Sequence, residues 1–279
     1  MHDVKRALLF DSGVGGLSVF DATVAAGLAV EIVYAADNAW LPYGDKADAA
    51  LRERVPQLLL ALRDQFAPDI IVVACNTAST IALDAARAMI VEPIVGVVPP
   101  IKPAAELSST GTIGLLATPA TVARSYTDDL IERFAMNTNV IRFGSTRLVA
   151  LAEARLANQT GDTAALAEAI DQLFGAPGGS MIDVVALACT HFPLLKAELA
   201  AAGPQQCAWL DSGAAIARRV AALLALTPGA GTPAPLCALF SRAAPSLHAA
   251  FKARGFGTFG SIGAAPGFEV TLQGEAAAP

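Results

Sequence analysis

Short apolar runs alternate with longer amphipathic segments along most of the chain. The apolar runs are typical of buried strands, and each leads into a polar turn followed by apolar residues at helical spacing. This alternation predicts an α/β protein with doubly wound, mostly parallel sheets. The predicted strands cover residues 7–10, 31–35, 70–74, 94–97, 112–116, 140–143, 183–187 and 208–210.

A long helical pattern covers residues 47–66 and contains Pro56. Proline lacks a backbone N–H, and its ring clashes with the preceding helical turn. We therefore expect two helices here, separated at Pro56. Another helix is predicted over residues 79–90.

Two polar motifs occur twice, each time directly after a predicted strand or one residue further on. Asp11-Ser12-Gly13 recurs as Asp211-Ser212-Gly213, and Cys75-Asn76-Thr77 has a counterpart in Cys189-Thr190-His191. Ligands of doubly wound sheets bind beyond the carboxyl ends of the strands. The repeats predict two pseudo-symmetric lobes, with an active-site cleft between them that brings both cysteines to one ligand.

Cys75 and Cys189 are the candidate reactive groups. A thiol at the end of a buried strand and the start of a helix lies near unpaired N–H groups and the positive end of the helix dipole, which favour the thiolate. Cys207 and Cys237 have no polar turn after them and are predicted to be ordinary apolar residues. The spacing of the four cysteines indicates neither a disulfide framework nor a metal site.

Composition narrows the range of partners. The 279 residues are 54% hydrophobic, which is enough for a substantial core, and the net charge of -6 disfavours nucleic acid. Apolar runs end before the length of about 18 residues that a membrane span needs. The apolar stretch at 7–10 is too short for a signal peptide. We expect a cytoplasmic protein with a small-molecule substrate.

Five motifs, in order and over nearly the whole chain, resemble the cofactor-independent Asp/Glu racemase family. They are Asp11-Ser12-Gly13-Val14-Gly15-Gly16-Leu17-Ser18-Val19, Pro42-Tyr43-Gly44, Ala74-Cys75-Asn76-Thr77-Ala78-Ser79, Lys102-Pro103-Ala104-Ala105 and Cys189-Thr190-His191-Phe192-Pro193-Leu194-Leu195. The resemblance implies a first domain of residues 1–95 and 210–279, which carries Cys75, and a second domain of residues 96–209, which carries Cys189. It also implies that the reaction needs no cofactor and no metal.

The activity that the resemblance implies is interconversion of L- and D-glutamate, which supplies D-glutamate for peptidoglycan. Inverting an α-carbon requires one group to remove a proton from one face and another to deliver a proton to the opposite face. Thiols suit both tasks because their pKa lies near neutrality. By resemblance, Cys75 takes the proton of the D enantiomer and Cys189 that of the L enantiomer.

The resemblance implies further roles around the two thiols. Asp11 assists Cys75, although an aspartate here also fits a simple helix cap. His191 assists Cys189, and Glu153 aligns with a supporting glutamate, although it also fits an exposed helical position. The implied substrate contacts are Asp11, Ser12, Tyr43, Gly44, Asn76, Thr77, Thr190 and His191, with Thr118 and Thr121 as further candidates.

Other interpretations stay open at this point. Three of them are less favoured by the residues. Dinucleotide binding is disfavoured because the turn at 13–18 lacks the third glycine of a dinucleotide loop, and a redox pair of cysteines usually shares one motif. A hydrolase that uses Cys189 and His191 would need an oxyanion motif. An aspartate racemase is the nearest alternative enzyme, and an amino-acid sensor is the alternative outside enzymes. A homodimer is also compatible with the sequence.

Overall fold

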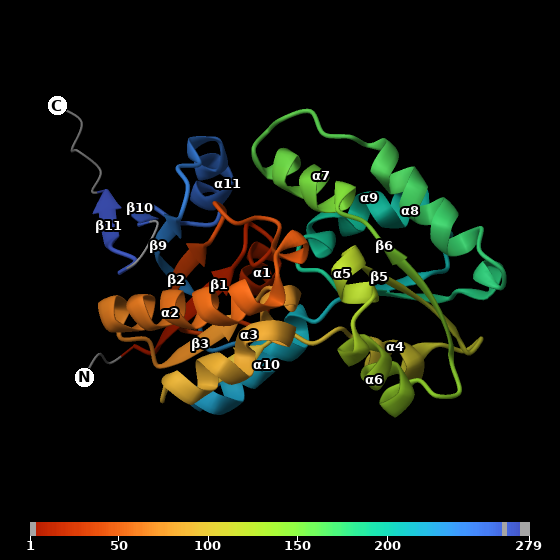
Figure 1. Ribbon diagram of the computed structural model, residues 1–279, viewed down its shortest axis with the longest axis horizontal. Coiled ribbons are helices and arrows are strands. Elements are labelled where there is room, and N and C mark those ends of the chain that lie inside the picture. The colour runs from red at the N-terminus through yellow and green to blue at the C-terminus, as the bar shows by residue number, and fades with distance from the viewer. Residues whose placement is uncertain (1–3, 264–266, 274–279) are drawn as a thin grey trace. The chain divides into compact units, whose positions relative to one another are not determined.

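The computed structural model describes residues 4–263 and 267–273 (Figure 1). The described chain forms two sheets, with strand orders β11-β10-β9-β2-β1-β3-β4 and β6-β5-β7-β8. All neighbouring strands run parallel except β10 and β11. The predicted α/β class with mostly parallel sheets is therefore confirmed.

Contacts within the chain define two units. Unit 1 is Met1–Val97, Leu156–Asn158 and Gly213–Pro279, and unit 2 is Val98–Arg155 and Gln159–Ser212. Unit 1 contains the seven-stranded sheet and unit 2 the four-stranded one.

Unit 1 is built on the larger sheet. Its strands are β1 (Arg6–Asp11), β2 (Glu31–Ala36), β3 (Ile70–Val73), β4 (Ile94–Gly96), β9 (Ala234–Phe240), β10 (Phe259–Ile262) and β11 (Val270–Gln273). Its helices are α1 (Leu17–Ala25), α2 (Asp48–Phe66), α3 (Asn76–Met89), α10 (Gly213–Leu224) and α11 (His248–Lys252), with short 3-10 helices η1 (Tyr43–Asp45) and η4 (Pro245–Leu247).

The two faces of the larger sheet are both buried, as expected where parallel strands have helices on both sides. On one face, Leu8 and Val33 pack with apolar residues of α2 and α3, which lie side by side in Figure 1. On the other face, Tyr34 of β2 packs its ring against Phe251 of α11. Successive strand residues thus point into different cores, which explains the continuous apolar runs in the sequence.

The expected break at Pro56 is wrong, because α2 is one helix from Asp48 to Phe66 with Pro56 inside it. Proline costs the helix one hydrogen bond, about 3 kcal/mol. The apolar face, however, continues on both sides of Pro56, with Leu51 and Leu62 both fully buried. We attribute the uninterrupted helix to this packing.

Unit 2 is built on the smaller sheet. Its strands are β5 (Thr112–Ala117), β6 (Asn139–Gly144), β7 (Val184–Leu187) and β8 (Ala208–Leu210). Its helices are α4 (Ile101–Leu107), α5 (Pro119–Val122), α6 (Ser125–Phe134), α7 (Arg147–Leu156), α8 (Ala164–Phe174) and α9 (Lys196–Ala202), with 3-10 helices η2 (Gly179–Met181) and η3 (Phe192–Leu195). Ile113, Leu115 and Val184 form its core with Ile101 of α4.

Each predicted strand is present, with ends that differ by at most one residue. Strands β9, β10 and β11 were not predicted. In the part of the chain that the structure describes, no helix has the length and apolar character to cross a membrane.

Candidate active site

Cys75 lies between β3 and α3 in unit 1. The whole of β3 is buried, and Cys75 has extended backbone (φ -69, ψ 121) as the residue that precedes the helix. Its carbonyl accepts the hydrogen bond of the Ser79 N–H at 2.9 Å. Cys75 therefore stands at the N-terminus of a 14-residue helix, as predicted, where unpaired N–H groups and the helix dipole favour a thiolate.

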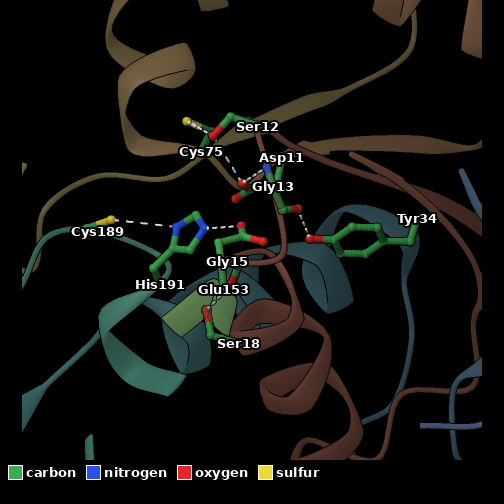
Figure 2. A network of polar contacts seen from close by, with 10 residues as sticks. All are labelled: Asp11, Ser12, Gly13, Gly15, Ser18, Tyr34, Cys75, Glu153, Cys189 and His191. Carbon is green, nitrogen blue, oxygen red and sulfur yellow. Dashed lines mark hydrogen bonds and ion pairs between the residues drawn. The ribbon is translucent and has the colours of Figure 1, made fainter. Parts of the chain in front are cut away.

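The turn after β1 brings a hydroxyl to this thiol (Figure 2). Ser12 Oγ lies 3.5 Å from Cys75 Sγ, and its hydroxyl is 3.4 Å from Asp11 Oδ1. Asp11 is fully buried, and its Oδ1 accepts the Gly13 N–H at 2.8 Å. The Asp11 carboxylate, the Ser12 hydroxyl and the Cys75 thiol thus form a chain of polar contacts that can hold a proton near Cys75.

Asp11 does not cap the helix that follows it, so that interpretation is wrong. The residue that precedes α1 is Gly16, and no side chain caps the helix there. Tyr34 instead holds the turn, because its hydroxyl donates to the Gly13 carbonyl at 2.7 Å. A Cβ on Gly16 would meet the Tyr34 hydroxyl at 2.9 Å, so only glycine fits this close approach without a shift.

Asn76 and Thr77 lie in the first turn of α3, and both are buried. The predicted start of this helix at residue 79 is wrong, because the Ser79 hydroxyl donates to the Val73 carbonyl of the strand and does not cap the helix. Within the described residues, the buried Asn76 Oδ1 has no hydrogen-bond partner. Buried amide oxygens are nearly always paired, so an ammonium group of a ligand would satisfy this atom.

Tyr43 and Gly44 lie in η1 of unit 1. Tyr43 is only 1% exposed, shares the core of Cys75, and donates its hydroxyl to Asp37 Oδ2 at 2.7 Å. Burial, the charge of Asp37, their hydrogen bond and the charge of Cys75 raise the pKa of Tyr43 well above its ordinary value, against the effect of Arg54. The hydroxyl hydrogen is thus committed to Asp37, whereas the phenol oxygen can still accept a hydrogen bond.

Cys189 of unit 2 follows β7 and is buried, but no α-helix begins there. An α-helical bond to the Cys189 carbonyl would come from the N–H of Pro193, which proline lacks. The Phe192 N–H donates to that carbonyl instead, at 3.1 Å, and the short 3-10 helix η3 follows. The expected helix start at Cys189 is therefore wrong for this physical reason.

An imidazole and a carboxylate accompany Cys189 (Figure 2). His191 Nδ1 lies 3.9 Å from Cys189 Sγ, and His191 Nε2 lies 2.8 Å from Glu153 Oε1 on α7. Burial opposes a charge on His191, but its hydrogen bonds to Cys189 and Glu153 and the charges of both raise the pKa of His191 well above its ordinary value. A histidine in hydrogen-bond contact with a thiol can take its proton and return it.

The other predicted residues of unit 2 have different surroundings. Thr190, which separates Cys189 from His191 in the sequence, is buried. Thr118 caps α5, because its hydroxyl oxygen accepts the Thr121 N–H at 3.3 Å and lies 2.9 Å from the Thr121 hydroxyl. These two threonines form a helix cap of the usual kind.

The two remaining cysteines are held as thiols. Burial, and for Cys207 also the charge of Asp183, raises the pKa of both Cys207 and Cys237 to about 11. Over residues 4–263 and 267–273, no cluster of three His, Cys, Asp or Glu side chains could hold a metal ion.

The sequence reasoning missed Asp37, Arg54 and Tyr34. Asp11 is the last residue of β1 and Asp37 directly follows β2, and this position at the carboxyl end of a strand is the signal that could have identified Asp37. Arg54 lies in the amphipathic helix α2, where an arginine is ordinary, so nothing in the sequence distinguished it.

Two buried thiols follow parallel strands, each beside proton-carrying side chains, which is an arrangement suited to an acid/base enzyme of the α/β class. Residues 17–220 match the Asp/Glu/Hydantoin racemase family. The chain is 52% identical over 238 residues to the glutamate racemase of Sphingopyxis alaskensis. The aligned residues cover 84% of this chain and 88% of the relative. It is 45% identical over 255 residues to that of Vibrio vulnificus, with 90% and 94% covered.

A solved structure agrees with these relatives. The crystal structure of Escherichia coli glutamate racemase, in complex with L-glutamate and the activator UDP-MurNAc-ala, matches with a TM-score of 0.84 and 40% identity. The match covers 97% of this chain and 100% of that one. The chain belongs to the Asp/Glu/Hydantoin racemase family, as its motifs indicated, and its reaction class is that of an isomerase.

Proposed function

We propose that this chain interconverts L- and D-glutamate with Cys75 and Cys189 as the two acid/base groups. Glutamate racemisation is the activity that the relatives support, and it implies a supply of D-glutamate for peptidoglycan. The observation that carries the two-base assignment is the presence of two buried thiols, each after a parallel strand and each with its own proton-carrying neighbours.

The reaction from L- to D-glutamate uses one thiolate and one thiol. The Cys189 thiolate removes the α-proton, which leaves the bonding electron pair on the α-carbon. The Cys75 thiol then gives its proton to the opposite face. D-glutamate leaves a thiol at Cys189 and a thiolate at Cys75, which is the state that the reverse reaction needs. The proposal therefore requires that both sulfur atoms reach the same α-carbon.

The neighbours of each thiol serve the two protonation states. The N-terminus of α3 and the Ser12 hydroxyl favour the thiolate of Cys75. The His191 imidazolium, held by Glu153, favours the thiolate of Cys189. The scheme as written uses only groups of the protein and the substrate.

The substrate contacts follow from polar groups near the thiols. Asn76 Oδ1 is suited to the ammonium group, because it accepts hydrogen bonds and lacks a partner among the described residues. We assign the carboxylates to backbone N–H groups and hydroxyls of the turns at Ser12, Tyr43–Gly44, Thr77 and Thr190. Asp11 and His191 complete the set of predicted contacts.

Proton exchange in deuterium oxide tests this function. Purified protein is incubated with L-glutamate or L-aspartate, while optical rotation and the α-hydrogen signal in NMR are followed. We expect glutamate to lose both its rotation and its α-hydrogen, with aspartate unchanged. Exchange of aspartate alone would make the chain an aspartate racemase, and no exchange of either would favour an amino-acid sensor.

The assembly can be measured on the same sample. A homodimer is the assembly we propose for the purified protein, and light scattering after size-exclusion chromatography gives its mass. A mass of about 28.5 kDa, that of one chain, would contradict the dimer without affecting the chemistry.

A further inference from the structure

A charged cluster of three side chains is buried in unit 1. Asp37 is fully buried, Arg54 is 8% exposed and Tyr43 is 1% exposed. Arg54 Nε and Nη2 donate to Asp37 Oδ2 and Oδ1 at 2.7 and 2.8 Å, which is a bidentate pair. The Tyr43 hydroxyl donates to Asp37 Oδ2 at 2.7 Å. Asp37 therefore joins α2 to the turn η1.

Aromatic rings enclose the guanidinium of this cluster. Arg54 Cζ lies 4.5 Å from the centroid of the Trp40 ring and 5.1 Å from that of Phe268. Such contacts fix the plane of a guanidinium and keep water from it. The two ring contacts and the bidentate pair with Asp37 together fix the orientation of the Arg54 guanidinium.

The cluster adjoins the catalytic residues of the proposed function. The Asp37 N–H donates to the Asp11 carbonyl at 2.9 Å. Tyr43 shares a core with Cys75, and the charge of Cys75 contributes to the raised pKa of Tyr43, so these side chains lie close together. Asp37 is therefore bonded through its backbone to Asp11 and through its side chain to Tyr43, in the turn assigned to the substrate.

We propose that Arg54 is a positioning residue, which through Asp37 holds the Tyr43–Gly44 turn for substrate and cancels a buried negative charge beside the Cys75 site. This inference rests on the proposed function. Glutamate brings two carboxylates, and the reaction needs a thiolate, so an uncompensated Asp37 would oppose both. Replacing Arg54 should then weaken substrate binding more than it weakens the later chemical steps.

Substitutions of the pair separate charge from shape. Arg54→Met keeps most of the apolar stem and removes the charge, and we expect KM for both enantiomers to rise about tenfold or more, with a smaller change in kcat. Arg54→Lys keeps the charge but loses the bidentate contact, so its KM should lie between that of the native protein and that of Arg54→Met. In Asp37→Asn combined with Arg54→Met, no charge is left to compensate and Tyr43 keeps an acceptor. Its KM should fall below that of Arg54→Met, because no buried charge remains, but stay above the native value, because position 37 is no longer held by Arg54.

The control uses a second ion pair on the same strands. Arg6 donates to Glu31 Oε2 at 2.7 and 3.0 Å, where β1 and β2 begin, whereas Asp11 and Asp37 lie where these strands end. Arg6→Met should leave KM unchanged. Thermal unfolding of every variant shows which of them are folded.

The outcomes decide between positioning and simple structural support. If the native protein racemises glutamate and Arg54→Met has the native KM, the inference is overturned and the proposed function stands. A double variant as impaired as Arg54→Met also overturns it, because lost packing would then be the cause. If Arg54→Met does not fold, Tyr43→Phe decides: a rise in KM of about threefold or more supports positioning, and an unchanged KM contradicts it. No racemisation by the native protein contradicts the proposed function itself.

Discussion

Cys75 and Cys189 both follow a fully buried strand of a parallel sheet, but the chain continues differently after each. Cys75 stands at the start of the 14-residue helix α3, with a hydroxyl at 3.5 Å from its sulfur. Cys189 is followed by the 3-10 helix η3, only four residues long, with an imidazole at 3.9 Å from its sulfur. One thiol has a helix dipole and a neutral donor, and the other has a cation held by a carboxylate.

The difference shows that one requirement has two physical solutions. A helix N-terminus carries about half a positive charge and needs no titrating group. Pro193 prevents such a helix after Cys189, and the charge of His191 takes its place. A site of the second kind depends on pH and on a single side chain, whereas a site of the first kind depends on backbone geometry.

Replacing either catalytic thiol tests whether the two sites are equally necessary. We expect Cys75→Ser and Cys189→Ser each to lower racemisation by about 10²–10⁴-fold, because a hydroxyl is far less acidic than a thiol. In deuterium oxide, Cys75→Ser should still exchange the α-hydrogen of L-glutamate through Cys189 without forming the D enantiomer. Cys189→Ser should show the mirror result.

The half-buried Cys207 provides the matched control for these substitutions. Cys207→Ser should retain native turnover, because burial holds Cys207 as a thiol. Native turnover in either catalytic variant would contradict the two-base mechanism.

The neighbours of the thiols should produce opposite asymmetries. His191→Asn removes the cation beside Cys189, and we expect a loss of kcat of about 10–100-fold. The primary deuterium isotope effect should rise more with α-deuterated L-glutamate than with the D form. Ser12→Ala should have a smaller effect on kcat and the reverse asymmetry. Equal isotope effects for both enantiomers in both variants would show that the neighbours do not serve separate thiols.

Asn76 offers a test of binding beside only one of the thiols. Asn76→Ala removes the acceptor that we assign to the ammonium group, so KM should rise about tenfold at little change in thermal stability. Stability should change little because Oδ1 has no partner to lose within the described residues. An unchanged KM would remove Asn76 from the substrate site.

The smallest expected effect concerns pH and Glu153. Because the folded protein raises the pKa of His191, its charged form stabilises the fold fully below pH 6.5, and this contribution is lost as pH rises through the raised pKa. Glu153→Gln removes one of the causes of the raised pKa. The native protein should therefore have a larger free energy of unfolding than Glu153→Gln, by about 1 kcal/mol, and this difference should be largest near pH 6 and decline toward pH 9. A difference independent of pH would contradict this. Glu168→Gln, at an exposed ion pair, is the control.

Local patterns were enough to predict the first eight strands and the position of Cys75, because strand periodicity and helix capping are encoded by neighbouring residues. The strands β9, β10 and β11 lie among alanine, proline and glycine residues, and their pairing with distant strands decides their conformation. Pro56 misled the prediction for the same reason, since packing on both sides outweighs a local preference.

Contacts between residues far apart in the sequence limited how much of the site could be predicted. Glu153 matched the family only weakly, yet its carboxylate lies 2.8 Å from His191, which is 38 positions away along the chain. Asp37 and Arg54 come from two different elements, and no spacing rule relates them. Side chains that meet only after the strands and helices pack are invisible to a reading of periodicity.

The strand β2 lies between β1 and β9 in the sheet of unit 1, although β9 follows the whole of unit 2 in the chain. During synthesis on the ribosome, one edge of β2 stays open until β9 has emerged, and pairing of such high contact order is slow. Nascent chains halted between these strands should therefore be substrates for chaperones that recognise exposed strand edges. The larger sheet is therefore completed only after the whole of unit 2 has been synthesised.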